Sequence, residues 1–271
     1  MEGPECRFIA KALAEKLTGK TIVDIFVRKP SAARYSKHPL TNLKDKKVRG
    51  VFCKGKNIVL NCEPYFAVVH LGMSAYFSAK APQNDKWFKS VSFSIALNTG
   101  EQLFCHDERG FGSVRFFMPG EEITPISELA PEVFDAEFTP EFFLNKAKGQ
   151  KTEVKPFLLN QKAVCCGLGN IYVAEILWLA GISPFKKTCD ITLDQASRIC
   201  ESARVIIAQA DYTGTSAIQT IAKNLPRGGG MSSCFSIYQK DRCANCGAAT
   251  TCARQNGRAT WYCSFCQKEG W

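Results

Sequence analysis

The chain has 271 residues, of which 45% are hydrophobic and 11% aromatic, a composition that supports packed cores and excludes a wholly disordered chain. The formal net charge of +10 favours a polyanionic partner such as nucleic acid. Apolar runs stay short of the about 18 residues that a membrane-spanning helix needs, and the first residues lack the apolar region of a signal peptide. We therefore expect an intracellular protein with no membrane partner.

An acidic segment opens the chain. It reads Met1-Glu2-Gly3-Pro4-Glu5, so two carboxylates stand beside an α-amine. The pKa of an α-amine is about 7.7–8.0 against about 10.4 for lysine, so a useful fraction is unprotonated near neutrality. Such an amine can attack an electrophilic carbon. The alternative interpretation is a frayed, solvated chain end whose acids only cap the following helix.

The next segments predict a helix and then many strands. Apolar residues recur at helical spacing over residues 5–17, and Gly19 can end that helix. From Thr21 to about Phe117 the apolar period changes to two, in short runs broken by Gly, Pro, Asn and Asp. A helix followed by short antiparallel strands predicts a β-sandwich with a helix on its flank.

The second half of the chain predicts helices. Pro119 to Glu141 carries seven acidic residues and no basic ones, which is typical of a linker. Helical spacing follows over residues 140–148, 154–161, 171–180 and 193–210. We therefore divide the chain into a β-sandwich domain (1–118), an acidic linker (119–139), a helical domain (140–233) and a zinc-finger module (234–271).

Four cysteines near the C-terminus have the spacing of a metal site. Cys243 and Cys246 form one Cys-x-x-Cys pair, and sixteen residues later Cys263 and Cys266 form another. Two such pairs close a tetrahedron of thiolates around one Zn²⁺, which lets a small module fold with little core. Redox pairs are the alternative. Cys252 lies off this pattern, and several other cysteines, Cys53, Cys62 and Cys105 among them, fall in apolar runs typical of reduced core thiols.

Two further segments suggest phosphate contacts. A Gly-rich turn ending in Asn170 leads into a helix, whose N-terminus offers backbone N–H groups to an anion, and Asn170 can cap that helix or bind the same oxygen. A packing joint between two helices is the alternative. Between the cysteine pairs, residues 257–262 predict a β-hairpin that presents Arg258, which in isolation would be a solvated charge.

Three turns in the β-rich half carry candidate residues. Lys56 lies in a Lys-Gly-Lys hairpin, and His70 and Met73 lie in a His-Leu-Gly-Met-Ser segment. Arg109 and Phe111 share a Gly-rich turn, where an exposed phenylalanine can insert into a base stack. The plain alternatives are solvated turns and residues at the rim of a core.

Together these segments resemble the formamidopyrimidine-DNA glycosylase/endonuclease VIII family of base-excision repair enzymes. The resemblance runs nearly from end to end and rests on six motifs in order: Glu-Gly-Pro-Glu, the lysine hairpin, His-Leu-Gly-Met-Ser, Asp-x-Arg-x-Phe-Gly, Leu-Gly-Asn-Ile-Tyr and a four-cysteine finger with Gly-Arg-x-Thr. It implies an α+β fold: a helix-flanked antiparallel β-sandwich, a hinge, and a helix-two-turn-helix domain with a β-hairpin zinc finger.

The resemblance implies a catalytic set at the N-terminus. In the family a residue before Glu-Gly-Pro-Glu, usually proline, attacks C1′ of the damaged nucleotide with its amine. Met1 holds that place here. Glu2 corresponds to the acid that protonates the sugar ring oxygen, Glu5 to a supporting carboxylate, and Lys56 to a lysine that contacts phosphate and assists as an acid. Because a primary amine gives an imine that can lose its proton, we expect weaker strand cleavage than in proline-bearing relatives.

The resemblance also implies a DNA-binding set. Asn170 and Arg258 correspond to the pair that grips the phosphates beside the lesion, His70 lies near phosphate and Glu175 near the lesion pocket. Met73, Arg109 and Phe111 correspond to the trio that fills the gap left by the extruded nucleotide. Gly110 stands where a second arginine is usual, which favours single-stranded or bubble DNA. Residues 215–233 correspond to the loop that covers the lesion.

These features predict a monomeric, bifunctional DNA glycosylase and AP lyase that removes oxidised bases, binds DNA with oxidised bases or abasic sites, and holds one structural Zn²⁺. One alternative is a non-catalytic damaged-DNA binder that lost its chemistry through the change to Met1. Another is a zinc-ribbon transcription or RNA factor, which explains the finger and the charge but not the acidic N-terminus.

Overall fold

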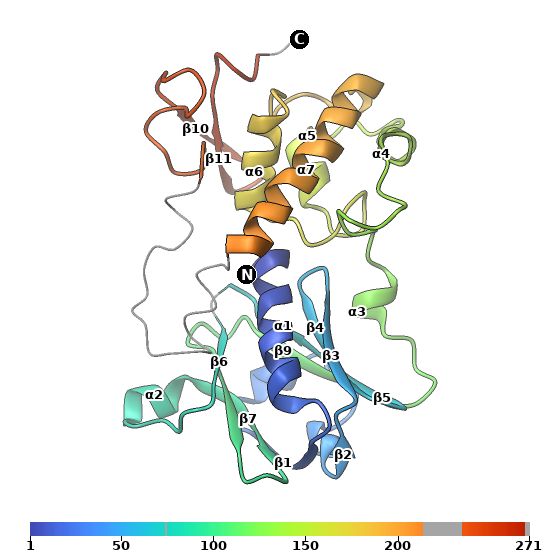
Figure 1. Cartoon of the computed structure of the whole chain (residues 1–271), viewed down its shortest axis with the longest axis vertical. Coiled ribbons are helices and arrows are strands. Elements are labelled where there is room, and N and C mark those ends of the chain that lie inside the picture. The colour runs from blue at the N-terminus through green and yellow to red at the C-terminus, as the bar shows by residue number, and fades with distance from the viewer. Residues whose placement is uncertain (74, 214–234, 269–271) are drawn as a thin grey trace. The chain divides into compact units, whose positions relative to one another are not determined.

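The computed structural model describes residues 1–73, 75–213 and 235–268, and its elements are labelled in Figure 1. The chain divides into two compact units, whose described parts are Met1–Glu128 and Leu129–Thr213 with residues 235–268. Within the described residues, no helix combines the length and the apolar character needed to cross a membrane.

Helix α1 (Gly3–Leu17) opens the first unit, two residues earlier than the sequence predicts. Pro4 lies in its first turn, where a missing N–H costs nothing, and the backbone N–H of Glu2 donates to a Glu5 carboxylate oxygen at 2.8 Å in a capping box. Its buried face includes Leu13 and Leu17. This first turn holds the acidic segment in a defined geometry and excludes the frayed chain end considered above.

Two antiparallel sheets follow. The five-stranded sheet has the order β2-β1-β7-β8-β6 and the four-stranded sheet the order β3-β4-β5-β9. The strands are β1 (Thr21–Val27), β2 (Lys46–Lys47), β3 (Gly50–Lys54), β4 (Asn57–Cys62), β5 (Tyr65–His70), β6 (Tyr76–Ser78), β7 (Val91–Leu97), β8 (Gln102–His106) and β9 (Ser113–Phe117). Shorter helices are η1 (Pro30–Ala33), η2 (Leu40–Leu43), α2 (Asp85–Ser90) and α3 (Thr124–Ser127).

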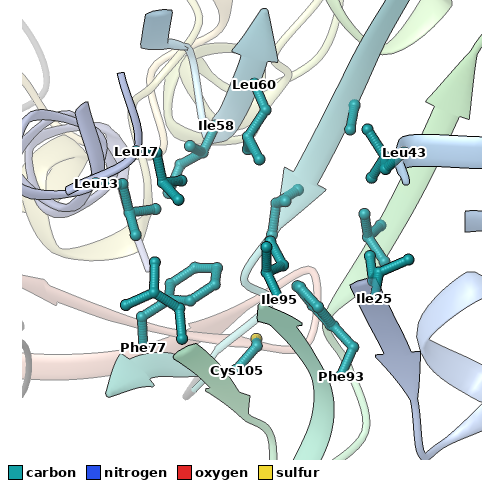
Figure 2. Close-up of a cluster of buried hydrophobic side chains, with 14 of the residues drawn as sticks. Leu13, Leu17, Ile25, Leu43, Ile58, Leu60, Phe77, Phe93, Ile95 and Cys105 are labelled. Carbon is teal, nitrogen blue, oxygen red and sulfur yellow. The ribbon is translucent and has the colours of Figure 1, made fainter. Parts of the chain in front are cut away.

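The first core lies where the two sheets and α1 meet. Figure 2 shows its side chains converging from α1 and from both sheets, and the labelled set is Leu13, Leu17, Ile25, Leu43, Ile58, Leu60, Phe77, Phe93, Ile95 and Cys105. Each such side chain contributes about 1.5–3 kcal/mol on burial. The predicted helix-flanked β-sandwich is therefore confirmed.

The second unit is helical, with a β-hairpin near its C-terminus. Its elements are α4 (Pro140–Ala147), α5 (Val154–Leu159), α6 (Asn170–Leu179), η3 (Thr188–Asp190), α7 (Leu193–Thr213), β10 (Thr251–Gln255) and β11 (Arg258–Tyr262). The predicted hairpin turns at Asn256 and Gly257, whose φ angles of 47° and 75° are the left-handed values that a tight two-residue turn requires. The predicted helices are present, with ends that differ by one to three residues.

The acidic segment 119–139 is shared by the two units. Its first half carries α3, and Ile123 and Ile126 pack on the outer face of the four-stranded sheet. Its second half supplies Val133 and Phe138 to the core of the second unit. The charge of this segment predicts a linker, whereas its apolar residues pack on the four-stranded sheet at one end and in the second core at the other.

Candidate functional site

The N-terminal amine is held by Gly72, which follows strand β5. Met1 is half-buried against the first core, and its amine donates a hydrogen bond to the carbonyl oxygen of Gly72 at 2.8 Å. The carboxylates of Glu2 and Glu5 lie in the adjoining first turn of α1. The candidate nucleophile and the two candidate acids therefore share one local structure.

The lysine hairpin lies against the same helix turn. It joins β3 to β4 as predicted, with Gly55 at a φ of 62°. The thiol of Cys6, in the first turn of α1, donates to the carbonyl oxygen of Lys56 at 3.6 Å. This contact brings the backbone of Lys56 beside the acidic residues at the N-terminus, although the two lie about fifty positions apart in sequence.

His70 sits in the electrostatic field of this group. Its Nδ1 accepts a hydrogen bond from the backbone N–H of Gly72 at 3.2 Å, so the neutral ring carries its proton on Nε2. Burial lowers the pKa of the imidazole, and four nearby cations lower it further: the Met1 amine, Lys56, Arg115 and Arg34. The structure therefore gathers Met1, Lys56 and His70 in one positively charged neighbourhood.

The candidate gap-filling residues are exposed, as an inserting side chain must be. Met73 is 63% and Phe111 50% exposed, and the guanidinium of Arg109 lies 5.1 Å from the Phe111 ring centroid. A Cβ on Gly72, at a φ of 60°, would lie 2.8 Å from the carbonyl carbon of Phe111. The turns that carry Met73 and Phe111 are therefore in backbone contact.

Two residues that the sequence analysis did not single out hold the Arg109 turn. The buried Asp107 carboxylate accepts the backbone N–H groups of Gly110 at 2.9 Å and Gly112 at 2.7 Å. Arg34, directly after η1, donates to the carbonyl oxygens of Gly110 at 2.8 Å and Phe111 at 3.1 Å. Asp107 was recognisable from its turn motif, but a partner about seventy-six positions away has no local sequence signal.

The second unit brings Asn170 and Arg258 together. Asn170 is the first residue of α6, and its side-chain amide donates to the carbonyl oxygen of Ala259 at 3.0 Å. The suggestion that Asn170 caps this helix is wrong, because Gly169 occupies the N-cap position without a side-chain hydrogen bond. The contact fixes Asn170 next to the residue that follows Arg258. Arg258 itself is exposed at the hairpin turn.

Lys155 reinforces this joint. It is almost fully buried in α5, and its ammonium donates to the carbonyl oxygen of Ala259 at 2.8 Å and to the Thr260 hydroxyl at 2.6 Å. Burial, followed by the nearby charge of Arg258, lowers the pKa of Lys155 to about 8. The sequence does not reveal this residue, because a lysine inside an apolar helix has the same local pattern as a solvated one.

Glu175 is engaged with backbone. It is 3% exposed, and its carboxylate accepts N–H groups from Ser236 at 2.9 Å, Ile237 at 3.1 Å and Tyr238 at 2.7 Å. These donors follow directly after residues 214–234, which include the proposed lesion loop and lie outside the described residues. The carboxylate thus anchors the chain at the C-terminal end of that segment.

The four predicted cysteines converge. Their sulfur atoms lie within 4.8 Å of one another, close enough to hold one metal ion. The Trp178 indole N–H donates to the Cys243 sulfur at 3.2 Å. Burial raises the pKa of the Cys243 thiol, but hydrogen bonds from the backbone of Cys246 and from Trp178 outweigh it and bring that pKa down to about 6. Cys252 is exposed and outside this group.

Comparisons with known proteins cover almost the whole chain. Family models described as the formamidopyrimidine-DNA glycosylase N-terminal domain and H2TH domain match residues 1–114 and 129–222. A formamidopyrimidine-DNA glycosylase of Bacillus cereus is 30% identical over 98% of both chains, and one of Photobacterium profundum is 27% identical over 98% of this chain and 99% of its own.

Solved structures agree with these sequence matches. A Lactococcus lactis FPG mutant in complex with a Fapy-dG containing DNA is 27% identical, with a TM-score of 0.87 over 99% of this chain and 100% of that one. The MutM (FPG) protein of Thermus thermophilus is 27% identical, with a TM-score of 0.85 over 100% of both. This chain belongs to the formamidopyrimidine-DNA glycosylase family, as its motifs predict.

Proposed function

We propose that this protein is a bifunctional DNA glycosylase and AP lyase that removes oxidised bases through a Schiff base on its own N-terminal amine. The observation that carries the proposal is the position of the Met1 amine, 2.8 Å from the Gly72 carbonyl oxygen and close enough to His70 to lower its pKa. The glycosylase class follows from the family, and the residue roles below extend it to this chain.

The proposed reaction begins with attack of the unprotonated amine on C1′, which forms a carbon–nitrogen bond. The bond from C1′ to the damaged base breaks, and the base leaves with its electron pair and takes up a proton. Glu2 protonates the sugar ring oxygen as the ring opens, and loss of the remaining amine proton gives the imine. From the protonated imine, loss of a C2′ proton forms a C2′–C3′ double bond and expels the 3′ phosphate with the C3′–O electron pair, which cuts the strand. Water then releases the amine. Glu5 and Lys56 support this chemistry as a second carboxylate and a phosphate-binding acid.

The remaining site residues extrude and hold the nucleotide in this proposal. Asn170 and Arg258 grip the phosphates beside the lesion, which is supported by their joint placement on Ala259. Met73, Arg109 and Phe111 fill the vacated space in the stack, which is supported by their exposure. His70 contacts phosphate through its Nε2 proton. The anchoring of residues 236–238 by Glu175 supports a role beside the lesion pocket.

We infer that the cysteine cluster holds one structural Zn²⁺, because four thiolates at this spacing are the preferred zinc ligands. The ion would stabilise the hairpin that presents Arg258 and would take no part in the reaction. We further infer that the partner is DNA containing oxidised bases or abasic sites, bound by a monomer in whichever intracellular compartment holds DNA.

Borohydride trapping on abasic DNA tests the nucleophile. Reduction of the imine should give a covalent adduct, and chemical acetylation confined to the N-terminal amine should abolish it. Absence of an adduct from the unmodified protein, with DNA binding retained, would support the non-catalytic binder and overturn the proposal. Preferred binding to undamaged RNA would instead support a zinc-ribbon factor.

A second experiment tests the consequence of a methionine at this place. A variant with a proline inserted before Glu2, exposed by removal of the initiator methionine, gives an iminium that remains charged. We expect it to nick the strand faster than the natural chain while releasing the base at a similar rate. Equal nicking by the two proteins would refute the link between the primary amine and weak strand cleavage.

A further inference from the structure

The first unit carries a cavity of about 350 Å³ on the outer face of its four-stranded sheet. The register pairs Val68 with Arg115 and His70 with Ser113, so these four side chains share one face. The described residues that line the cavity are Arg34, Tyr35, Asn57, Val68, His70, Phe111, Ser113, Arg115 and Pro125. The opposite face of these strands supplies Val69 and Val114 to the first core.

The cavity is positively charged. Two guanidinium groups line it, and none of its described lining residues is acidic. The field is strong enough that the charges of Arg115 and Arg34 contribute to the lowered pKa of His70. A concave surface of one charge sign attracts ligands of the opposite sign.

The two arginines are held in different ways. The hydrogen bonds of Arg34 go to backbone carbonyl oxygens of Ser31, Gly110 and Phe111 at 2.8–3.1 Å, so its charge is fixed in place. The side chain of Arg115 makes no hydrogen bond to protein in the described part of the chain, and its guanidinium lies 4.9 Å from the centroid of the Tyr35 ring. Arg115 therefore has an oriented, planar set of donors ready for an anion.

We propose that this cavity binds a phosphodiester of the DNA backbone, with Arg115 as its principal donor. The inference rests on the proposed function and adds Arg115 on β9 as a further phosphate donor to those already assigned, namely His70, Asn170 and Arg258. A guanidinium matches phosphate in bidentate geometry, and the Nε2 proton of His70 provides another donor. A volume of about 350 Å³ is at the small end for ligand sites, which favours one phosphate and its sugar over a whole nucleotide.

The salt dependence of binding to DNA with an uncleavable abasic-site analogue tests this contact. Loss of one phosphate contact lowers the slope of log K against log salt by about 0.7–0.9. Arg115→Leu should show that change with about tenfold weaker binding, since hydrogen bonds to charged groups contribute at this level. Arg115→Lys should keep the slope and recover part of the affinity.

Lys46→Leu is the matched control. Lys46 on β2 lies 4.3 Å from the Tyr65 ring centroid, so its removal costs the same charge and the same kind of ring contact away from the cavity. Its slope should stay near that of the natural protein. The proposed site is wrong if Arg115→Leu and Lys46→Leu have the same slope of log K against log salt and both unfold at the same temperature as the natural protein.

Single methylphosphonate substitutions identify the ligand. Neutralising one phosphate at a time should weaken the natural protein at one position where Arg115→Leu loses nothing further. If no position behaves in this way, the proposal fails. Inorganic phosphate at constant ionic strength that competes with DNA for the natural protein but not for Arg115→Leu would then show that the cavity binds free phosphate. Borohydride trapping by the natural protein and by Lys46→Leu tests the proposed chemistry separately, because both should still form the adduct when the cavity binds no phosphodiester.

Discussion

The amine of Met1 donates to the carbonyl oxygen of Gly72 at 2.8 Å. Gly72 in turn abuts Phe111, because a Cβ built on it would lie within 2.9 Å of that residue's backbone and Cβ atoms. One glycine therefore contacts both the candidate nucleophile and a turn proposed to fill the stack. Glycine is required here twice over, since its φ of 60° is also left-handed.

Gly72→Ala tests this coupling. The added methyl forces the Phe111 turn away and strains the backbone, so we expect at least a tenfold lower rate of adduct formation at saturating DNA, together with a loss of about 2–4 kcal/mol of stability. Gly100→Ala is the control, because Gly100 has a φ of 82° and open space around its Cβ position. It should cost about 1–2 kcal/mol and leave trapping unchanged. Equal trapping by both variants would contradict the coupling.

Protonation of His106 should limit stability in acid. Its ring is fully buried and stacks on Tyr76 and Trp87 at centroid distances of 4.7 Å and 5.5 Å. Its Nδ1 donates to the Ser90 hydroxyl at 2.7 Å, because that hydroxyl gives its own proton to the Trp87 carbonyl oxygen. Burial lowers its pKa to about 4. The unfolded chain takes up the proton near pH 6.5 and the folded chain only near pH 4, so stability is present above pH 6.5 and is lost as pH falls between these values.

The loss at pH 5 relative to pH 7.5 should be about 2 kcal/mol from this residue. Urea unfolding at both pH values measures it. His106→Phe keeps a ring in the stack but cannot titrate, so its stability should fall less between the two pH values. A variant whose pH dependence matches that of the natural protein would show that other groups dominate the acid response.

Glu175→Gln tests whether this side chain anchors the backbone or touches the lesion. The amide replaces one acceptor oxygen with a donor that faces backbone N–H groups, so we expect a loss of about 2–3 kcal/mol. Hydrogen exchange should accelerate at Ser236, Ile237 and Tyr238. If stability and exchange are unchanged while the preference among oxidised bases shifts, the residue acts on the lesion directly.

The cysteine cluster predicts a clear contrast between two substitutions. Cys263→Ser should lower the proposed zinc content from one ion per chain to a small fraction and abolish DNA binding, because in our proposal the hairpin that carries Arg258 depends on the metal. Cys252→Ser should change neither, since that thiol is exposed on β10 outside the cluster. Elemental analysis and binding assays measure both. Trp178 fluorescence should change on chelation, because its indole N–H contacts Cys243. A zinc-free protein that cuts DNA normally would overturn the structural role.

Short-range patterns explain what the sequence predicts well. The first turn of α1, the hairpin at Gly55 and the hairpin at Gly257 each follow from a few adjacent residues with specific backbone preferences. The cysteine spacing is equally local. Family motifs then assign the proposed chemistry to residues on these elements.

Contacts between distant segments are what the sequence does not reveal. Arg34 reaches Gly110, Lys155 reaches Thr260, and each pair is separated by more than seventy positions. A lysine or arginine in the sequence does not indicate a buried hydrogen-bond partner, because both residue types are commonly solvated. The cavity around Arg115 likewise depends on strand register, which periodicity alone does not give.

The carbonyl oxygen of Ala259 receives donors from both Lys155 and Asn170. Helices α5 and α6 are thus both hydrogen-bonded to the same peptide group, and the hairpin can rotate relative to them only if both hydrogen bonds break. The backbone of Arg258 at the hairpin turn and the side-chain amide of Asn170 at the start of α6 are therefore held at a fixed separation. In the proposed function, the distance between the phosphate oxygens that these two side chains can bind is set when the unit folds, before DNA is bound.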